Sequence, residues 1–249
     1  MTRLILASVL AVLTLAAPAV ATDLSNMTDT ERDAFRAEVR AYLLDNPEVL
    51  NEAQLVLEQR RERQQAAFDA ALIGTNAKDI FNDGYSWSGG NPKGDITLVE
   101  FMDYRCSYCR KAYDEVNALI ETDGNIRFVV KEFPILGEES ELASRFAIAT
   151  LQVAGDEAYA KVHDALMTYR GKFSIKSLTS LADKHDLDSD AIVARMTAPE
   201  VNDVIGANYA LAQRLAIGGT PTFVMDDRML RGYAPLADMQ QMVSEVRAD

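Results

Sequence analysis

Apolar residues recur at helical intervals through residues 23–73. Thr28 and Glu31 have the spacing of a capping box, which predicts the start of a helix. The apolar positions of this helix follow at helical spacing: Phe35, Val39, Tyr42 and Leu43. Asn46 and Pro47 then end it and begin a second helix, which has no internal breaker before about residue 73.

The second helix has two interpretations, because a polar stretch from Glu58 to Gln65 interrupts its apolar stripe. It either lies on the domain that follows or forms an arm that buries the stripe against another subunit. The second interpretation makes the protein a homo-oligomer through residues 23–73. We treat residues 22–76 as an N-terminal helical arm in both cases.

Behind a turn-rich junction (residues 74–94), strands and helices alternate. A strand at 96–102, a helix from about 107 to 121 and a strand at 126–133 predict a βαβ unit with parallel strands. Residues 138–217 then have almost wholly helical periodicity. Two short strands (222–225 and 229–231) and a helix (235–246) follow. We therefore predict an α/β domain over residues 77–249, with a helical insertion at about 138–217.

Composition and charge exclude several function classes. The 249 residues include 38 acidic and 25 basic side chains, a net charge of -13, which argues against nucleic acid or an anionic bilayer as a partner. The only two cysteines, Cys106 and Cys109, cannot staple a disulfide-rich fold or supply a four-cysteine zinc site.

The N-terminal residues have the pattern of a secretory signal peptide. Arg3 precedes the apolar run Leu4–Ala17, and Ala19-Val20-Ala21 forms an A-x-A site, so we expect residues 1–21 to be removed after Ala21. The alternative is an N-terminal membrane anchor, although the run is short for a span. The mature protein is then expected in the periplasm, where disulfides form and persist.

Cys106 and Cys109 stand where a strand passes into a helix. The first turn of a helix presents unpaired N–H groups and a partial positive charge, which stabilise a thiolate. We expect these groups, together with Arg105, Arg110 and Lys111, to lower the pKa of Cys106 and make it the attacking sulfur. Cys109, one turn further, is placed to resolve a mixed disulfide at Cys106.

The cysteine pair has two alternative uses, a structural disulfide and a zinc site. A purely structural bridge would gain little from so small a ring. A zinc site would need two more ligands, and the two histidines, His163 and His185, are 22 residues apart on helical segments. We expect each histidine to be a surface or partly packed residue, and we predict no metal and no cofactor.

Pro221 stands directly before a predicted strand, in the sequence Gly219-Thr220-Pro221-Thr222. Only about 5–6% of X–Pro bonds in folded proteins are cis, so spacing alone predicts a trans, strand-initiating proline.

Together these motifs resemble the thioredoxin fold, and more narrowly the periplasmic thiol:disulfide oxidoreductases of the DsbA type. The resemblance covers about residues 79–249 and rests on two phrases, residues 99–109 (VEFMDYRCSYC) and residues 133–137 (FPILG). Residues 42–50 (YLLDNPEVL) are similar to the N-terminal extension of the ScsC (suppressor of copper sensitivity) branch.

The resemblance implies a role for each matching residue. Cys106 is the nucleophile and Cys109 the resolving thiol of a redox-active disulfide. Pro221 is a cis-proline facing them, and Thr220 offers backbone hydrogen bonds to an extended substrate. Glu100 is a buried acid that exchanges protons with Cys109, and Lys131 is its possible charge partner. Ser107 and Tyr108 tune the pair, and Tyr108 also contacts substrate.

These inferences predict an exported oxidoreductase that acts on cysteine-containing secreted proteins and is reset by a membrane redox partner. Whether it forms, isomerises or reduces disulfides stays open at this point. Two alternatives also stay open: a non-catalytic binding or surface protein that reuses the fold, and a copper-related thiol protein.

Overall fold

The computed structural model describes residues 24–248, which divide into two compact units. One unit extends to Gln59 and the other begins at Arg60. This division falls inside helix α2 (Glu48–Phe81), before the boundary that the sequence suggests at residues 76 and 77. The expected signal peptide, residues 1–21, lies outside the described residues.

Among residues 24–248, the helices are too short or too polar for any of them to span a bilayer.

The first unit contains a short 3-10 turn (Leu24–Asn26), helix α1 (Asp29–Asp45) and the start of α2. The predicted capping box is confirmed, since the Thr28 amide donates to the Glu31 carboxylate at 2.8 Å and the Glu31 amide donates to Thr28 Oγ1 at 3.4 Å. None of residues 29–45 is buried. The apolar stripe of α1 is therefore uncovered.

Helix α2 continues further than the sequence pattern indicated. A turn was expected from Gly74 onward, but the helix extends through this glycine to Phe81. A glycine inside a helix costs about 1 kcal/mol relative to alanine. Burial of Ile73 and Ile80, which are 2% and 0% exposed, outweighs that cost because a fully buried isoleucine contributes about 1.5–3 kcal/mol.

Within residues 24–248, five strands form one sheet in the order β1-β3-β2-β4-β5. They are β1 (Ser88–Gly90), β2 (Ile96–Met102), β3 (Ile126–Glu132), β4 (Thr222–Met225) and β5 (Arg228–Arg231). Strands β2 and β3 pair in parallel through helix α3 (Ser107–Asp123), which confirms the predicted βαβ unit. The other pairings are antiparallel. Strand β1 was not predicted, because it has only three residues and two are glycines.

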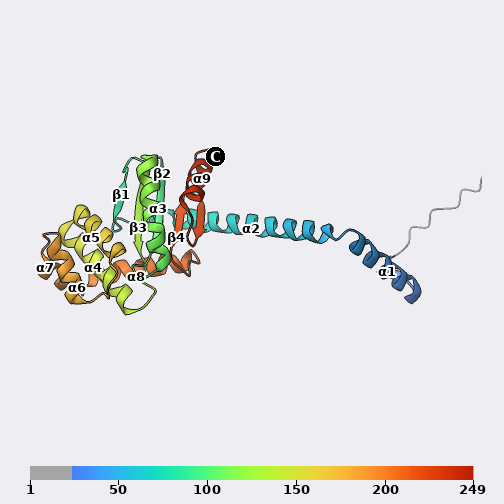
Figure 1. Cartoon of the computed structure of the whole chain (residues 1–249), viewed down its shortest axis with the longest axis horizontal. Helices are drawn as coiled ribbons and strands as arrows, with labels where there is room; N and C mark the ends of the chain where they lie inside the picture. The colour runs from blue at the N-terminus through green and yellow to red at the C-terminus, as the bar shows by residue number, and fades with distance from the viewer. Residues whose placement is uncertain (1–23, 249) are drawn as a thin grey trace, which may run out of the picture. The chain divides into compact units, whose positions relative to one another are not determined.

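Alternate residues of the central strands pack into different cores. Leu98 belongs to a core with α3 and α9 (Leu236–Val246), whereas Val99 belongs to a core with Ile80 of α2 and Leu215 after α8 (Pro199–Arg214). The sheet is thus covered by α3 and α9 on one face and by the end of α2 and α8 on the other (Figure 1). Residue parity along a strand decides which core a side chain enters.

The predicted helical insertion is confirmed. It comprises α4 (Glu138–Ala154), α5 (Asp156–Thr168), α6 (Ile175–Lys184), α7 (Ser189–Arg195) and α8, and the first four gather beside the sheet (Figure 1). Helix α7 was not predicted. Asp188 caps it, with Oδ1 accepting from the Ala191 amide at 3.0 Å, and Ile192 anchors it in the core.

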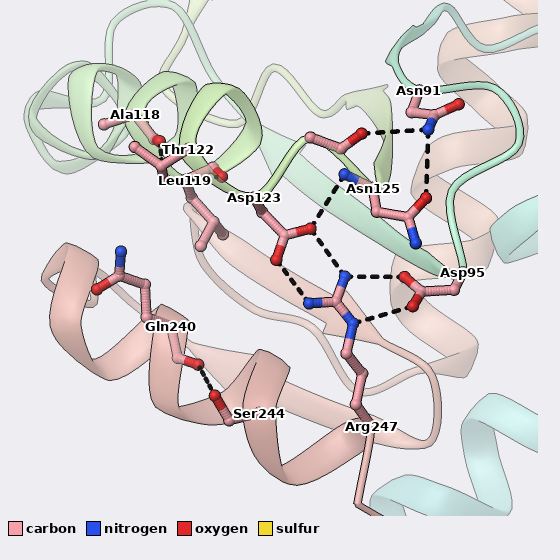
Figure 2. Close-up of polar contacts among 11 residues, drawn as sticks. Asn91, Asp95, Ala118, Leu119, Thr122, Asp123, Asn125, Gln240, Ser244 and Arg247 are labelled. Carbon is pink, nitrogen blue, oxygen red and sulfur yellow. Dashed lines mark hydrogen bonds and ion pairs between the residues drawn. The ribbon is translucent and has the colours of Figure 1, made fainter.

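Arg247 ties together three segments at one end of the domain (Figure 2). It follows α9, and its guanidinium donates to both carboxylate oxygens of Asp95, before β2, at 2.8 and 3.0 Å. It also donates to both oxygens of Asp123, the last residue of α3, at 2.6 and 2.8 Å. The planar guanidinium thus holds the C-terminal ends of α3 and α9 at the start of β2.

Candidate active site

Cys106 is the N-cap residue of α3, as the sequence predicts. Its backbone is extended, and its sulfur accepts a hydrogen bond from the Cys109 amide, 3.5 Å away. Both cysteines are free thiols in this structure. The N-cap position directs the sulfur at the unpaired amides of the first helical turn.

The pKa of Cys106 is lowered from 9.0 to about 5. The leading cause is a hydrogen bond from the Cys109 side chain, followed by bonds from the Thr220 side chain and from the backbone amides of Cys109 and Tyr108, against an opposing effect of burial. These hydrogen bonds, and not the charges of Arg105, Arg110 and Lys111 as expected, lower the pKa of Cys106. Arg110, for example, directs its guanidinium to the carbonyl oxygens of Tyr104 and Tyr169.

The pKa of Cys109 shifts in the opposite direction to that of Cys106. It is fully buried, and burial, its bond to Cys106 and the nearby Glu100 charge all raise its pKa. At neutral pH the pair therefore consists of one thiolate and one thiol. The thiolate is the nucleophile, and the thiol keeps its proton until a base accepts it.

The loop before β4 brings Thr220 and Pro221 to the same sulfur. Cys106 Sγ lies 3.2 Å from the Thr220 carbonyl oxygen, to which it donates when it is protonated. The Thr220–Pro221 peptide bond is cis. The prediction of a trans bond from spacing alone is therefore wrong, and the cis bond implied by the family resemblance is confirmed. The pairing of Thr222 with Phe101 holds this loop beside the end of β2.

Tyr108 is the exposed member of the C-x-x-C motif. Its side chain is 59% exposed, and its ring centroid lies 6.5 Å from that of Tyr233. An exposed aromatic ring two residues from the nucleophile offers contact area to a docked chain. Its predicted contact with substrate stays a prediction.

Glu100 is buried, as the resemblance implies, with 3% of its surface exposed. Its Oε1 atom has no hydrogen-bond partner among residues 24–248. Burial, followed by the charges of Cys106 and Glu132, raises its pKa to about 8. Glu100 is thus a carboxyl group that can gain or lose a proton close to neutral pH.

Lys131 does not pair with Glu100, which corrects the sequence-based expectation. Its ammonium group donates to the Asp83 carboxylate and, at 2.7 Å, to the Asp79 carbonyl oxygen. Glu100 is in register with Val130, so Lys131 is one residue out of phase and points to the opposite face of the sheet.

Sequence reasoning missed a buried polar cluster around Glu132. Its carboxylate accepts from Tyr104 at 2.8 Å, from Ser144 at 2.7 Å and from Tyr159 at 2.6 Å. Burial raises the pKa of Glu132 to about 7, although these three hydrogen bonds lower it. The only sequence signal was the position of Tyr104, two residues before Cys106.

His163 belongs to the same cluster, which corrects the expectation of a surface or partly packed residue. It is 4% exposed, and its Nδ1 lies 3.0 Å from the Tyr104 hydroxyl. Burial lowers its pKa to about 4. His163 is therefore a neutral core residue that helps to hold Tyr104.

Two protein families match this chain. Residues 97–244 match the DSBA-like thioredoxin domain, and residues 31–67 match the copper resistance protein ScsC N-terminal domain. The first match contains both cysteines, Glu100 and Pro221. The second lies in the helical N-terminal part.

Solved structures agree with this assignment. A thioredoxin-like oxidoreductase from Silicibacter pomeroyi is 40% identical and covers 69% of this chain and 98% of its own, with a TM-score of 0.65. The thiol-disulfide exchange protein alpha-DsbA2 from Wolbachia pipientis is 25% identical, covers 74% and 98%, and has a TM-score of 0.68. A linker-deletion mutant of Proteus mirabilis ScsC shares the fold over 89% of this chain and 97% of its own (23% identity, TM-score 0.67).

Curated relatives include the Na(+)/H(+) antiporter NhaA 1 of Salinispora arenicola, which is 30% identical over 149 residues. That match covers 57% of this chain, which spans only 22% of the length of that relative. The family match covers more than half of this chain and agrees with the five-stranded sheet and its helical insertion. The chain belongs to the DSBA-like thioredoxin domain family, with an N-terminal region of the ScsC type.

Proposed function

We propose that this protein is an exported thiol:disulfide oxidoreductase that exchanges disulfides with cysteine-containing secreted proteins. The observation that carries the proposal is the asymmetry of the pair, a Cys106 thiol with a pKa of about 5 beside a buried Cys109 whose pKa is raised. The match to the DSBA-like thioredoxin domain family and the similarity to a thiol-disulfide exchange protein also support the proposal. The N-terminal signal pattern supports export.

The proposed exchange has two steps. The Cys106 thiolate attacks a substrate disulfide, forms a mixed disulfide and releases one substrate thiolate. Cys109 then loses its proton and attacks the Cys106 sulfur, which releases the second substrate thiolate and leaves a Cys106–Cys109 disulfide. The enzyme pair is oxidised and the substrate is reduced, and the reverse sequence donates a disulfide.

Glu100 is the group that we assign to the Cys109 proton. With a pKa of about 8 it can hold a proton or release it at neutral pH, and its charge acts on Cys109. Thr220 and Pro221 flank the Cys106 sulfur, where backbone groups of an extended substrate would align beside them. A membrane redox partner would reset the pair after each cycle.

Turnover of a scrambled multi-disulfide protein tests this proposal. We expect the wild type to catalyse regain of the native disulfides, and Cys106→Ser to have no activity. Cys109→Ser should accumulate mixed disulfides with the substrate. If Cys106→Ser retained the wild-type rate, the fold would be reused for binding alone and the proposal would be wrong. The redox state of the pair in cell extracts, disulfide or dithiol, then assigns the direction.

We also propose that the N-terminal region mediates self-association. The supporting observation is the uncovered apolar surface of α1, where Phe35, Val39, Leu43 and Leu44 line a shallow hollow with two arginines. Exposed apolar patches of this kind mark contact surfaces.

The molar mass of the protein in solution tests this second proposal. Phe35→Glu/Val39→Glu should convert an oligomer into a monomer, because it places charges on the stripe. Ala37→Glu/Ala41→Glu is the matched control, since it adds the same charges on the opposite side of α1. A wild-type protein that is monomeric at all concentrations would contradict the proposal.

A further inference from the structure

Two segments of this acidic protein carry a local excess of basic residues. Residues 105–111 contain Arg105, Arg110 and Lys111 and no acidic residue. Residues 170–184 contain Arg170, Lys172, Lys176 and Lys184, with Asp183 as the single acid. This local excess contrasts with a net charge of -13 for the whole chain.

The fold joins these two segments into one surface next to the nucleophile. One hollow is lined by Arg105, Ser107, Arg110, Lys111 and Arg170, and Ser107 directly follows Cys106. A second hollow, between the end of α5 and α6, is lined by Arg170 together with Lys172, Lys176 and Lys184. Because Arg170 lines both hollows, they form a continuous basic surface that begins beside Cys106, at the residues before and after it.

The protein itself hardly neutralises this surface. Among residues 24–248, only Arg105 of the seven has a carboxylate within 4 Å, that of Glu139 at 3.7 Å, and that pair is partly exposed. Lys111 instead places its ammonium group 4.0 Å from the centroid of the Tyr233 ring. The exposed side chains of Arg170, Lys172, Lys176 and Lys184 are therefore available to an external anion.

Arg110 shows that these cations are held together against their mutual repulsion. Burial lowers its pKa, and the charges of Arg105 and Arg170 lower it further, while the Asp103 charge has a smaller opposing effect. Two backbone carbonyls bind its guanidinium, at 2.7 Å (Tyr104) and 2.6 Å (Tyr169). Its buried Nη2 atom has no hydrogen-bond partner within the part of the chain that the structure describes. An anion brought to this surface would relieve the repulsion.

We propose that this basic surface selects substrates by binding acidic residues that flank the reacting cysteine. The inference rests on the proposed function and names its substrate class, which is acidic polypeptide segments of secreted proteins. A polypeptide fits better than a membrane because the surface begins beside Cys106, where the partner must present a sulfur. Opposite charges at such a surface accelerate encounter and exclude wrong partners.

Three peptides that differ only in the charge of the residues beside one cysteine test the proposal. Each carries that cysteine as a mixed disulfide with thionitrobenzoate, and flanking residues are acidic, neutral or basic. The Cys106 thiolate of the reduced full chain attacks the peptide sulfur and releases coloured thionitrobenzoate thiolate. Cys109 then displaces the peptide as a thiolate. The second-order rate constant of release is the readout, and the label is the same in all three.

We expect the acidic peptide to react about tenfold faster than the neutral one at low ionic strength, and the basic peptide to react more slowly. High salt should remove most of the difference, because the Debye length falls to about 3 Å at 1 M. Arg170→Gln/Lys172→Gln/Lys176→Gln should lower the ratio of acidic to neutral rate constants at least about twofold, while Arg105 and Lys111 keep part of the preference.

Lys78→Gln/Lys93→Gln/Lys161→Gln is the matched control. It removes the same charge at three exposed lysines outside both hollows, and it should keep the wild-type ratio. Equal rate constants for the three peptides with wild-type protein would overturn this inference and leave the proposed function standing. Failure of all three peptides to react would instead overturn the proposed function. Co-sedimentation with phosphatidylglycerol vesicles that depends on the three substituted residues, without a peptide preference, would assign the surface to a membrane.

Discussion

The backbone nitrogen of Cys109 lies 3.5 Å from the sulfur of Cys106, across the first turn of α3. One helix start thus holds the two thiols in different environments. Cys106 is 7% exposed and directed at amide donors, whereas Cys109 is fully buried. Their pKa values move apart as a result, and the chemistry of the site depends on that separation.

Replacing Cys109 tests how much its side chain stabilises the thiolate. In Cys109→Ala the pKa of Cys106 should rise from about 5, because the first of its causes is lost, but stay below 9.0 since the amides of Cys109 and Tyr108 remain. Ultraviolet absorbance of the thiolate against pH measures it. Ser88→Ala is the control, because Ser88 is an exposed residue of β1 outside the C-x-x-C motif. An unchanged pKa in Cys109→Ala would show that the amides alone suffice.

Substituting Glu100 should change how stability depends on pH. The folded pKa of about 8 lies above the ordinary 4.5, so the folded state keeps a proton that the unfolded chain releases across this window. Stability from this group therefore falls as pH rises from about 4.5 to about 8. Glu100→Gln removes that loss. As the pH rises, the free energy of unfolding of the variant should therefore increase relative to that of the wild type by up to about 1.4 kcal/mol per pH unit.

Urea unfolding of both reduced proteins at several pH values measures this gain. Cys106 contributes with the opposite sign, since its pKa is lowered, but it is present in both proteins and its effect largely cancels in the difference. Glu132, with a pKa raised to about 7, is likewise common to both. A difference in unfolding free energy that does not vary with pH would contradict the assignment of a raised pKa to Glu100.

The buried pair of Lys131 and Asp83 should be a determinant of stability. Their side chains are 0% and 6% exposed. Lys131→Met leaves the Asp83 carboxylate buried without its partner and should lower the free energy of unfolding by about 3–5 kcal/mol. Lys131→Met/Asp83→Asn should lose less, because no charge stays buried alone. Urea unfolding compares the three proteins.

The double variant also distinguishes the observed pairing from the one expected from sequence. Lys131 contacts the end of α2, on the face of the sheet opposite Glu100. The stability difference that Glu100→Gln produces should therefore depend on pH in the same way in the wild type and in the Lys131→Met/Asp83→Asn background. A pH dependence that shifts when Lys131 is replaced would indicate that its charge acts on Glu100.

Arg247 should hold the end of α9 in place. Arg247→Lys keeps the charge but cannot bind both Asp95 and Asp123 with two pairs of hydrogen bonds. Because the three side chains are partly exposed, we expect only a small decrease of the unfolding midpoint, about 2 °C, together with faster amide exchange at the end of α9. Unchanged exchange in α9 would show that its core residues alone hold it.

Local sequence patterns were sufficient for much of the fold. Apolar runs and the cysteine spacing predicted β2, α3 and β3 and the placement of Cys106 at a helix start, because each depends on residues close in sequence. The predicted end of helix α2 was wrong, because the actual end depends on contacts with residues distant in the sequence. Gly74 signals a turn locally, but burial of Ile73 and Ile80 against the sheet keeps the segment helical.

The rest of the site depends on contacts between distant segments. The Thr220 carbonyl contacts Cys106, which is 114 residues away in the sequence, and His163 contacts Tyr104, which is 59 residues away. Strand register decides that Glu100 and Lys131 face opposite cores, and a single sequence does not reveal register. Propensity alone also favoured a trans Pro221, and only the family resemblance indicated the cis bond.

The titration of the Cys106 thiol tests the central claim most directly. The reduced protein is alkylated with iodoacetamide over a range of pH, and the rate at each cysteine is followed by peptide mass analysis. We predict that Cys106 reacts with an apparent pKa of about 5, while Cys109 stays unreactive through neutral pH because its pKa is raised. An apparent pKa near 9.0 for Cys106, its ordinary value, would contradict the account.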